Sequence, residues 1–467
     1  MSEAISGQLS ASGTGSHPIV AGSANSIIAY RGTRPVTRAQ FLADVAAAAA
    51  RLPDRRHVIN VCNDRYLFLV GFAAALARGQ ISLLPPSRVT GVVVAIAEDY
   101  GDCYLLADTH VGDGALPLYC LTLETTAAAP SAATTEAVAI PLQRTAAIVF
   151  TSGSTGKATP NIKTWRGLVE GAQINAAALL QGREAGAAAV TLVATVPQQH
   201  MYGLETTVML PLMGACAAQC DRPFFPADVL AALERTPMPR ILVTTPIHLR
   251  ALADSGAGAP ALTEIWSATA PLNPELAADC ERRFAAPLRE ILGSSETGTF
   301  ATRCTARDEP WRLVDGFSLT PSGDGITISA AHLGSSAELQ DSVEMLGARS
   351  FRLLGRTRDL VNIAGKRASL GDLNARLLSI PGVRDGIIFL PAEPAGNPGT
   401  GAPVRTAAMV VAPGLTARQV LAALRTLIDP AFLPRPLLLV EALPRNETSK
   451  LPRSALLALF AEHVNAS

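Results

Sequence analysis

Hydrophobic residues in this chain form short runs of strand length that alternate with longer Ala- and Leu-rich stretches of helix length. Strands that alternate with helices are typical of α/β layers in which the strands are largely parallel. The pattern therefore predicts an α/β fold. The clearest segments are 81–84, 146–150, 190–196 and 241–244 for strands, and 41–52 and 227–233 for helices.

The pattern changes in the last third of the chain. Residues 310–352 hold short apolar runs such as Gly325-Ile326-Thr327-Ile328-Ser329, which predict antiparallel strands. Residues 127–137 and 392–403 are rich in Ala, Pro, Gly, Ser and Thr and lack a period, so we expect surface loops there. The residues after 359 are expected to form a small α/β unit.

Length and charge narrow the class of protein. The 467 residues exceed a single ordinary core and predict at least two domains. Basic and acidic residues number 39 each, which gives no reason to expect nucleic acid or an anionic membrane surface as a partner. The apolar runs are shorter than the ~20 residues that span a bilayer. Residues 1–26 lack the basic region followed by an apolar core that is typical of a secretion signal. We therefore expect a cytoplasmic enzyme with a flexible N-terminus over 1–26 and no membrane span.

Seven cysteines are scattered along the chain without Cys-x-x-Cys spacing. That usage predicts reduced, mostly buried thiols and no zinc site. Cys216 and Cys220 have the spacing of one helix face, where simple packing is the favoured interpretation.

The segment with the most chemical content is Phe150-Thr151-Ser152-Gly153-Ser154-Thr155-Gly156-Lys157, which follows an apolar run. A strand that ends in such a turn offers backbone N–H groups, hydroxyls and glycines that let the main chain approach anionic oxygens. It is not a Walker loop, because no Gly-Lys-Ser/Thr closes it. The segment predicts a loop that binds polyphosphate.

Five motifs in this order resemble the adenylate-forming superfamily, which includes acyl- and aryl-CoA synthetases, peptide-synthetase adenylation domains and luciferases. The resemblance covers about residues 60–455. The motifs are Thr151-Ser152-Gly153-Ser154-Thr155-Gly156, Pro197-Gln198-Gln199-His200-Met201-Tyr202-Gly203, Leu292-Gly293-Ser294-Ser295-Glu296-Thr297, Gly355-Arg356-Thr357-Arg358-Asp359 with Gly365-Lys366-Arg367, and Leu443-Pro444-Arg445-Asn446-Glu447-Thr448-Ser449-Lys450.

The resemblance implies a large N-terminal AMP-binding domain of layered sheets and helices over 27–354. It also implies a hinge over 355–359 and a small mobile α/β C-terminal cap domain over 360–467. Arg358 stands where the family has the hinge residue. Such a cap is expected to rotate between two half-reactions.

By the same resemblance the chain uses ATP and Mg²⁺, and Glu296 stands where the family has the Mg²⁺ carboxylate. One Glu suits Mg²⁺, because this ion keeps waters and substrate phosphates as further ligands. Asp341 occupies roughly the position of the family's ribose-binding aspartate, although its neighbours differ from the family pattern. The residues implied in nucleotide binding are Thr151, Ser152, Gly153, Ser154, Thr155, Gly156, Ser295, Asp341, Arg356 and Arg367.

Lys450 is the implied catalytic lysine of adenylation, since an ammonium near the attacking carboxylate and the α-phosphate neutralises developing charge. His200 is implied to gate the acid pocket, and Glu296 is the third catalytic residue. The implied lining of the acid pocket is Gln199, Tyr202, Gly203, Thr245 and Ser267.

Two departures from the family pattern bear on function. Thr159 occupies the position of the usual phosphate-loop lysine, so either Lys157 or Lys163 would replace that charge. The continuation Pro160-Asn161-Ile162-Lys163-Thr164-Trp165 resembles a compact subgroup from aryl polyene pathways. No Asp closely follows the His200 segment to bind an α-ammonium, and Glu205 is a weak stand-in, which argues against amino acids as substrates.

The resemblance thus implies an AMP-forming acid–thiol ligase. It would adenylate an aryl or fatty (hydroxy) acid and transfer the acyl group to a pantetheine thiol, with an acyl carrier protein preferred over free CoA. Three alternatives stay open: an acyl/aryl-CoA synthetase that uses free CoA, a non-catalytic AMP-binding-like module, and a luciferase-like oxidative enzyme.

Overall fold

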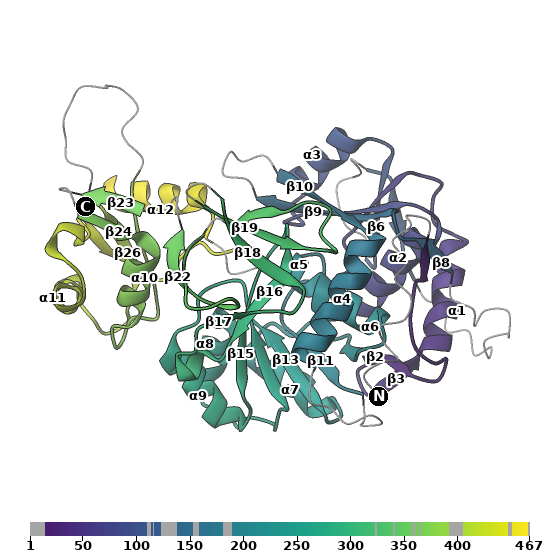
Figure 1. Cartoon of the computed structure of the whole chain (residues 1–467), viewed down its shortest axis with the longest axis horizontal. Coiled ribbons are helices and arrows are strands. Elements are labelled where there is room, and N and C mark those ends of the chain that lie inside the picture. Colours follow the sequence, from purple (N-terminus) through teal and green to yellow (C-terminus); the bar gives the residue numbers. More distant parts are fainter. Residues whose placement is uncertain are drawn as a thin grey trace.

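A computed structural model gives the fold of the chain, built on two large sheets with helices around them (Figure 1). The structure describes residues 15–109, 114, 116–122, 138–152, 158–180, 189–322, 325–339, 341–356, 360–363, 366–391, 405–446 and 451–465.

The first large sheet has six strands in the order β10-β9-β5-β4-β6-β7. Its strands from β9 to β7 run parallel, and the edge strand β10 is antiparallel to β9. The strands are β4 (His57–Asn60), β5 (Ile81–Leu84), β6 (Cys103–Ala107), β7 (Leu118–Cys120), β9 (Thr145–Ser152) and β10 (Ala158–Thr164).

The second large sheet has eleven strands in the order β21-β22-β17-β16-β15-β14-β13-β11-β12-β2-β3. The stretch from β15 to β2 is parallel, and the strands on both sides of it are antiparallel. The strands are β2 (Ile27–Arg31), β3 (Arg34–Thr37), β11 (Thr191–Ala194), β12 (Ala217–Gln219), β13 (Arg240–Thr244), β14 (Glu264–Ser267), β15 (Leu288–Ser294), β16 (Gly298–Arg303), β17 (Trp311–Leu313), β21 (Asp341–Met345) and β22 (Ser350–Arg356).

Both faces of the parallel strands are buried, which explains their unbroken apolar runs. In β13, Ile241 and Val243 join one core and Leu242 joins the core on the other face. Successive side chains of a strand point to opposite faces, so a strand covered on both sides needs apolar residues throughout. The predicted α/β fold with largely parallel strands is confirmed.

Helices cover the sheets and lie between them. Helix α2 is buried all around, from Arg65 to Leu76, and packs with α1, α4 and η2 into one core that includes residues of the six-stranded sheet. A helix that is apolar on every side is typical of such a buried layer. The helices are α1 (Arg38–Ala49), α2 (Arg65–Ala77), α3 (Thr90–Tyr100), α4 (Trp165–Leu179), α5 (Met201–Gly203), the π-helix η2 (Leu204–Met209), α6 (Leu210–Leu212), α7 (Pro226–Arg235), α8 (Pro246–Asp254), α9 (Pro274–Phe284) and the 3₁₀-helix η3 (Thr305–Arg307).

Two smaller sheets accompany the large ones. The antiparallel strands predicted within 310–352 include β18 (Phe317–Ser322), β19 (Gly325–Ala330) and β20 (Ala337–Leu339), so this prediction is confirmed. The second small sheet joins β1 (Ser16–Pro18) to β8 (Ala139–Pro141).

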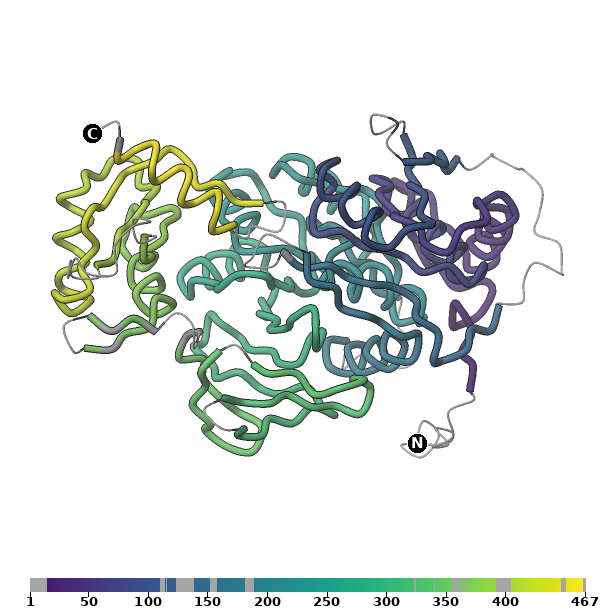
Figure 2. The backbone as a smooth tube through the Cα atoms, turned by 90° about the horizontal axis from the view of Figure 1, so that it is seen from above, coloured from purple at the N-terminus to yellow at the C-terminus, as the bar shows by residue number. Residues whose placement is uncertain are grey.

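The elements after residue 360 form two cores of their own, whose members all come from Val361 onward. They gather at one end of the molecule, drawn in green to yellow, in both views (Figures 1 and 2). The division into domains at 355–359 stays a prediction. The elements are β23 (Leu360–Ile363), β24 (Lys366–Ser369), α10 (Leu370–Leu378), β25 (Asp385–Phe389), β26 (Ala407–Val411), α11 (Ala417–Leu427), the 3₁₀-helix η5 (Pro430–Phe432), β27 (Leu437–Leu439) and α12 (Arg453–Asn465).

The suggestion that Cys216 and Cys220 share a helix face is wrong. The three residues between them form β12, a parallel strand beside β11 and β2. Both cysteines are buried at the two ends of that strand, and strand pairing overrides the helical spacing that the sequence offered.

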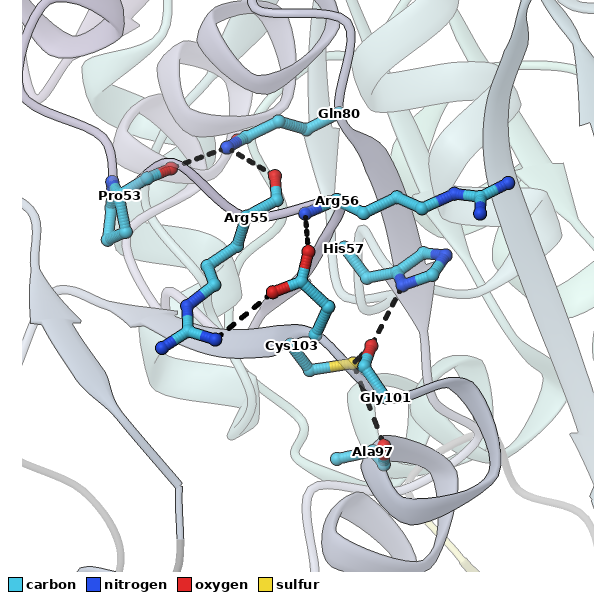
Figure 3. A network of polar contacts seen from close by, with 9 residues as sticks. Pro53, Arg55, Arg56, His57, Gln80, Ala97, Gly101 and Cys103 are labelled. Atoms are coloured by element: carbon cyan, nitrogen blue, oxygen red, sulfur yellow. Dashed lines mark hydrogen bonds and ion pairs between the residues drawn. The ribbon is translucent and has the colours of Figure 1, made fainter.

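A polar network fixes the amino ends of β4 and β6 (Figure 3). The Asp102 carboxylate accepts from the Arg56 N–H at 2.8 Å and from the Arg55 guanidinium at 3.1 Å, and His57 Nδ1 lies 3.0 Å from the Gly101 carbonyl oxygen. His57 therefore has a structural role. None of the helices that the structure describes combines the length and apolar character needed to cross a bilayer.

Candidate active site

The carboxyl ends of the parallel strands in the eleven-stranded sheet carry several of the predicted site residues. Thr245 follows β13, Ser267 ends β14, and Thr244 and Ser267 are partners in the register of these strands. The Thr244 hydroxyl lies 2.9 Å from the hydroxyl of Thr195, which follows β11. Because carboxyl ends of parallel strands share one edge, and ligands of open α/β sheets bind there, this edge is the candidate site.

The segment from Pro197 to Gly203 also follows β11 and folds back tightly on itself. His200 precedes the first turn of α5 in an extended conformation, and its N–H donates to the Pro197 carbonyl at 3.4 Å. A Cβ on Gly203 would lie only 2.0 Å from that same carbonyl oxygen. Gly203 is therefore the residue that lets this turn close, a role that its place in the motif did not reveal.

The turn between β15 and β16 presents Ser295, which is half-buried, and Glu296, which is exposed. The Ser294 hydroxyl accepts from the Thr297 N–H at 3.2 Å and so stabilises the turn. An exposed carboxylate beside a hydroxyl suits Mg²⁺, which binds few protein oxygens and keeps waters and phosphates. These residues fit a Mg²⁺ site.

Lys163 joins this turn to the other large sheet. It lies on β10, and its ammonium donates to the Glu296 backbone carbonyl at 3.1 Å. Burial lowers the pKa of Lys163, and the nearby Glu205 and Glu296 partly oppose that change. Of the two candidate replacement lysines, Lys163 therefore holds the turn that carries the candidate metal ligand, while Lys157 lies outside the described residues.

Glu205, which the sequence suggested only as a weak stand-in, is the buried centre of this region. Its carboxylate accepts from the Thr299 N–H at 3.1 and 3.2 Å, the Thr299 hydroxyl at 3.0 Å and the Asn175 amide at 3.1 Å. Burial raises the pKa of Glu205, while the hydrogen bonds and the charge of Lys163 oppose the rise.

Glu205 therefore fixes the start of β16 to the π-helix η2 that follows the His200 segment. Gly298 makes room for this contact, because a Cβ there would lie 2.3 Å from Glu205 Oε1 and the backbone φ is +68°. π-helical turns occur often at functional sites. The signal for Glu205 in the sequence was one acid within an apolar stretch.

The predicted phosphate loop connects β9 to β10, with Ser152 and Ala158 as the last register partners. The Thr151 hydroxyl donates to the Thr159 carbonyl at 3.4 Å. The rest of the loop lies outside the described residues, and so do Arg358 and Lys450. These undescribed loop residues are Gly153, Ser154, Thr155 and Gly156.

The residues predicted to bind ribose are neighbours in a sheet. Asp341, the first residue of β21, is the register partner of Arg356, the last residue of β22. Arg367 lies on β24 opposite Asn362, and the Lys366 ammonium contacts the Asp429 carboxylate at 2.6 Å. Lys366 is thus paired within the C-terminal elements.

Several buried polar atoms at the candidate site have no hydrogen-bond partner among the described residues: Gln199 Nε2, Tyr202 OH and Ser267 Oγ. Gln199 and Ser267 are buried, and burial raises the pKa of Tyr202 far above its ordinary value, which keeps its hydroxyl protonated. Buried polar atoms are normally satisfied. Such a group of atoms fits a polar ligand bound here.

His248 supports Thr245 from α8. Its Nδ1 lies 2.9 Å from the Thr245 hydroxyl, and its ring packs on the edge of Phe224 at 5.4 Å between centroids. Burial lowers the pKa of His248 to about 4.

The depressed pKa of His248 predicts acid sensitivity. The folded-state pKa lies below the ordinary 6.5, so the stability that neutral His248 contributes is complete above pH 6.5 and is lost as the pH falls towards 4. Between pH 7.5 and 5 we expect wild type to lose about 2 kcal/mol more unfolding free energy than His248→Gln. Urea titrations of both proteins at the two pH values measure this, and equal losses would contradict it.

Comparison with known proteins places these features in a family. The family described as AMP-binding enzyme matches residues 23–321. A 4-coumarate–CoA ligase of Halorhodospira halophila is 29% identical over 256 residues, which are 52% of this chain and 59% of that protein. The chain thus aligns with little more than half of that relative's length.

Solved structures share the fold over nearly the whole chain. The o-succinylbenzoate CoA synthetase of Bacillus subtilis, in complex with ATP and magnesium, superimposes with a TM-score of 0.74 at 17% identity, covering 92% of this chain and 96% of that one. A benzoate CoA ligase of Burkholderia xenovorans LB400 gives 0.72 at 19% identity, covering 93% and 96%. At these identities the likeness shows a common fold.

Proposed function

Because the chain belongs to the AMP-binding enzyme family, we propose that it is an ATP-dependent, AMP-forming carboxylate ligase. The observation that carries the proposal is the convergence of three motif segments. Lys163 from the strand after the phosphate loop contacts the Glu296 turn, and Glu205 from the helix after His200 fixes the other end of that turn. A site of this kind can hold polyphosphate, a divalent cation and an acid side by side.

In this proposal Thr151, Ser152 and the undescribed loop bind the phosphates of ATP. Ser295 adds a phosphate contact, and Glu296 ligates Mg²⁺, which would neutralise charge on the phosphates. Asp341, Arg356 and Arg367 serve the nucleotide. Lys450 assists attack of the acid's carboxylate on the α-phosphate.

The acid would lie among Gln199, His200, Tyr202, Thr245 and Ser267. We propose an aryl or fatty (hydroxy) acid as substrate and a pantetheine thiol as acceptor, preferably that of an acyl carrier protein as in aryl polyene pathways. The compact continuation of the phosphate loop supports this choice. The C-terminal elements from 360 to 467 would act as a mobile cap that turns about Arg358 between adenylation and thiol transfer.

The test is carboxylate-dependent exchange of pyrophosphate into ATP. Hydroxybenzoates, cinnamates, medium-chain and hydroxy fatty acids, and amino acids form the panel. Exchange with one of the first three classes is expected. Exchange with amino acids alone would overturn the substrate class, and absence of both exchange and ATP binding would favour a non-catalytic module. Supplying the active acid with carrier protein or with free CoA then separates the two acceptors.

The Lys450→Ala variant separates the two half-reactions. Loss of one charge-stabilising group costs about 10²–10³ in rate, so we expect exchange to fall by roughly 100-fold. Transfer from supplied acyl-adenylate should continue, because that step forms a thioester and releases AMP. It does not involve attack of a carboxylate on the α-phosphate. Undiminished exchange in the variant would remove Lys450 from the mechanism.

A further inference from the structure

The side chain of Arg88, which follows β5, lies against the candidate acid pocket. Its guanidinium donates to Gln199 Oε1 at 3.2 Å, to the Cys62 carbonyl at 3.1 Å and to the Asn63 amide oxygen. Arg222 donates to the same Asn63 oxygen at 3.2 Å. Every acceptor in these contacts is neutral.

The contact with Arg88 fixes the orientation of the Gln199 amide. A guanidinium has donors only, so the atom of Gln199 that faces Arg88 must be the oxygen. The amide nitrogen then points elsewhere with two N–H donors. Gln199 is 1% exposed, and its Nε2 has no partner among the residues that the structure describes.

A buried amide N–H without an acceptor is unfavourable, and an acceptor on a bound ligand would remove that penalty. Gln199 shares its short segment with Tyr202, whose buried hydroxyl likewise lacks a partner within the described part of the chain. Two buried donors three residues apart in one turn form a built polar site rather than a packing defect.

We propose that Gln199 is the specificity residue of the acid pocket, held by Arg88 as its positioning residue, and that it donates to an oxygen of the substrate other than the reacting carboxylate. This inference rests on the proposed ligase function and narrows it to oxygenated acids. A hydroxyl, carbonyl or second carboxylate oxygen meets the requirement, whereas an unsubstituted aryl or alkyl acid leaves Nε2 unpaired.

The charges around Gln199 favour an electron-rich oxygen there. Arg88 and Arg222 come from two different loops, one after β5 and one after β12, and converge on one amide oxygen. Asp64, Asp108 and Arg88 are all close enough to act on the Cys62 thiol, and the Asp64 N–H donates to the Asp108 carboxylate at 2.6 Å, so acidic groups also belong to these surroundings. Phe224, two residues after Arg222, supplies an apolar surface. Its ring makes a T-shaped contact with the ring of His248, which in turn contacts the Thr245 hydroxyl.

The experiment compares matched pairs of acids that differ by one oxygen: benzoate with hydroxybenzoates, cinnamate with hydroxycinnamates, and octanoate with hydroxyoctanoates. The kcat/KM of pyrophosphate exchange is measured for wild type, Gln199→Met and Arg88→Met. Wild type should favour the oxygenated member of at least one pair tenfold or more, because sites built to bond a substrate hydroxyl reject its analogue strongly.

In Gln199→Met this preference should shrink to within about threefold, by a fall for the oxygenated acid alone. Gln199→Glu keeps the contact with Arg88, fills the same volume and removes both donors, so it should lose the preference too. Arg88→Met should lose part of it. Arg55→Ala, in the network of Figure 3, is the control and should keep it.

The outcomes separate the inference from the proposed function. An equal fall for both members of a pair means that Gln199 serves the reacting carboxylate, and an unchanged preference means that it serves neither. Either result, or a wild type that favours the unsubstituted acids, overturns the inference while the ligase stands. Absence of exchange with every acid overturns the function and the inference together.

Discussion

Replacing Gly203 with Ala is expected to slow adenylation severely and to destabilise the fold. The new Cβ would lie 2.0 Å from the Pro197 carbonyl oxygen and 2.8 Å from its carbon. Backbone cannot move aside as a flexible side chain can, so the turn that carries Gln199 and His200 must open. Overpacking of this kind costs about 3 kcal/mol, and a 1 Å displacement of site residues costs roughly 100-fold in rate.

Gly171→Ala is the matched control for Gly203→Ala. Gly171 lies within α4, and its Cβ would meet only the His332 ring, at an ordinary 3.7 Å. In a helix this change stabilises by about 0.5–1 kcal/mol. Urea unfolding should therefore show a loss of stability for Gly203→Ala and a gain for Gly171→Ala, and pyrophosphate exchange should fall in Gly203→Ala alone. A Gly203→Ala protein as active as wild type would show that the turn closes without this close approach.

Glu205→Leu should cost about 3–5 kcal/mol of unfolding free energy, the usual effect of removing one partner from a buried charged network. The change leaves the Thr299 N–H and hydroxyl and the Asn175 amide without their shared acceptor, and it removes the negative charge near Lys163. The β15–β16 turn would also lose its anchor, so exchange should fall with stability. Urea titration measures the effect.

Glu309→Leu serves as the control for Glu205→Leu, because Glu309 pairs with Arg307 on the surface and such pairs contribute about 0–1 kcal/mol. The pH dependence gives a second readout. The folded-state pKa of Glu205 lies above its ordinary 4.5, so this group's contribution to stability falls as the pH rises through the raised value. The difference between wild type and Glu205→Leu should therefore be larger at pH 5 than at pH 8, and the reverse trend would contradict the assignment.

The sequence predicted the fold class because the alternation of strands and helices depends on local patterns. Apolar runs such as 241–244 indicate strands covered on both faces, and the structure confirms β13 there. Carboxyl ends of parallel strands then bring Thr245 and Ser267 to one edge without further information.

What the sequence could not predict depends on contacts between distant elements. Glu205 contacts Thr299 and Asn175 only when η2, β16 and α4 are packed together. The spacing of these residues in the sequence does not predict that contact. The same holds for Arg88 and Gln199, which are 111 residues apart. The prediction that Cys216 and Cys220 share a helix face was wrong for a local reason. Residues four apart also flank a strand of three residues, so their spacing does not distinguish the two structures.

The contact between Lys163 and the Glu296 carbonyl spans the two large sheets, since β10 belongs to one and the β15–β16 turn to the other. The turn that carries the proposed metal ligand Glu296 is thus held by a side chain from the other sheet. The proposed active site therefore needs both sheets in their packed arrangement, and correct secondary structure alone would not assemble it. A protein that keeps its secondary structure but loses the packing between the two large sheets would have a native circular dichroism spectrum and still lack the proposed activity.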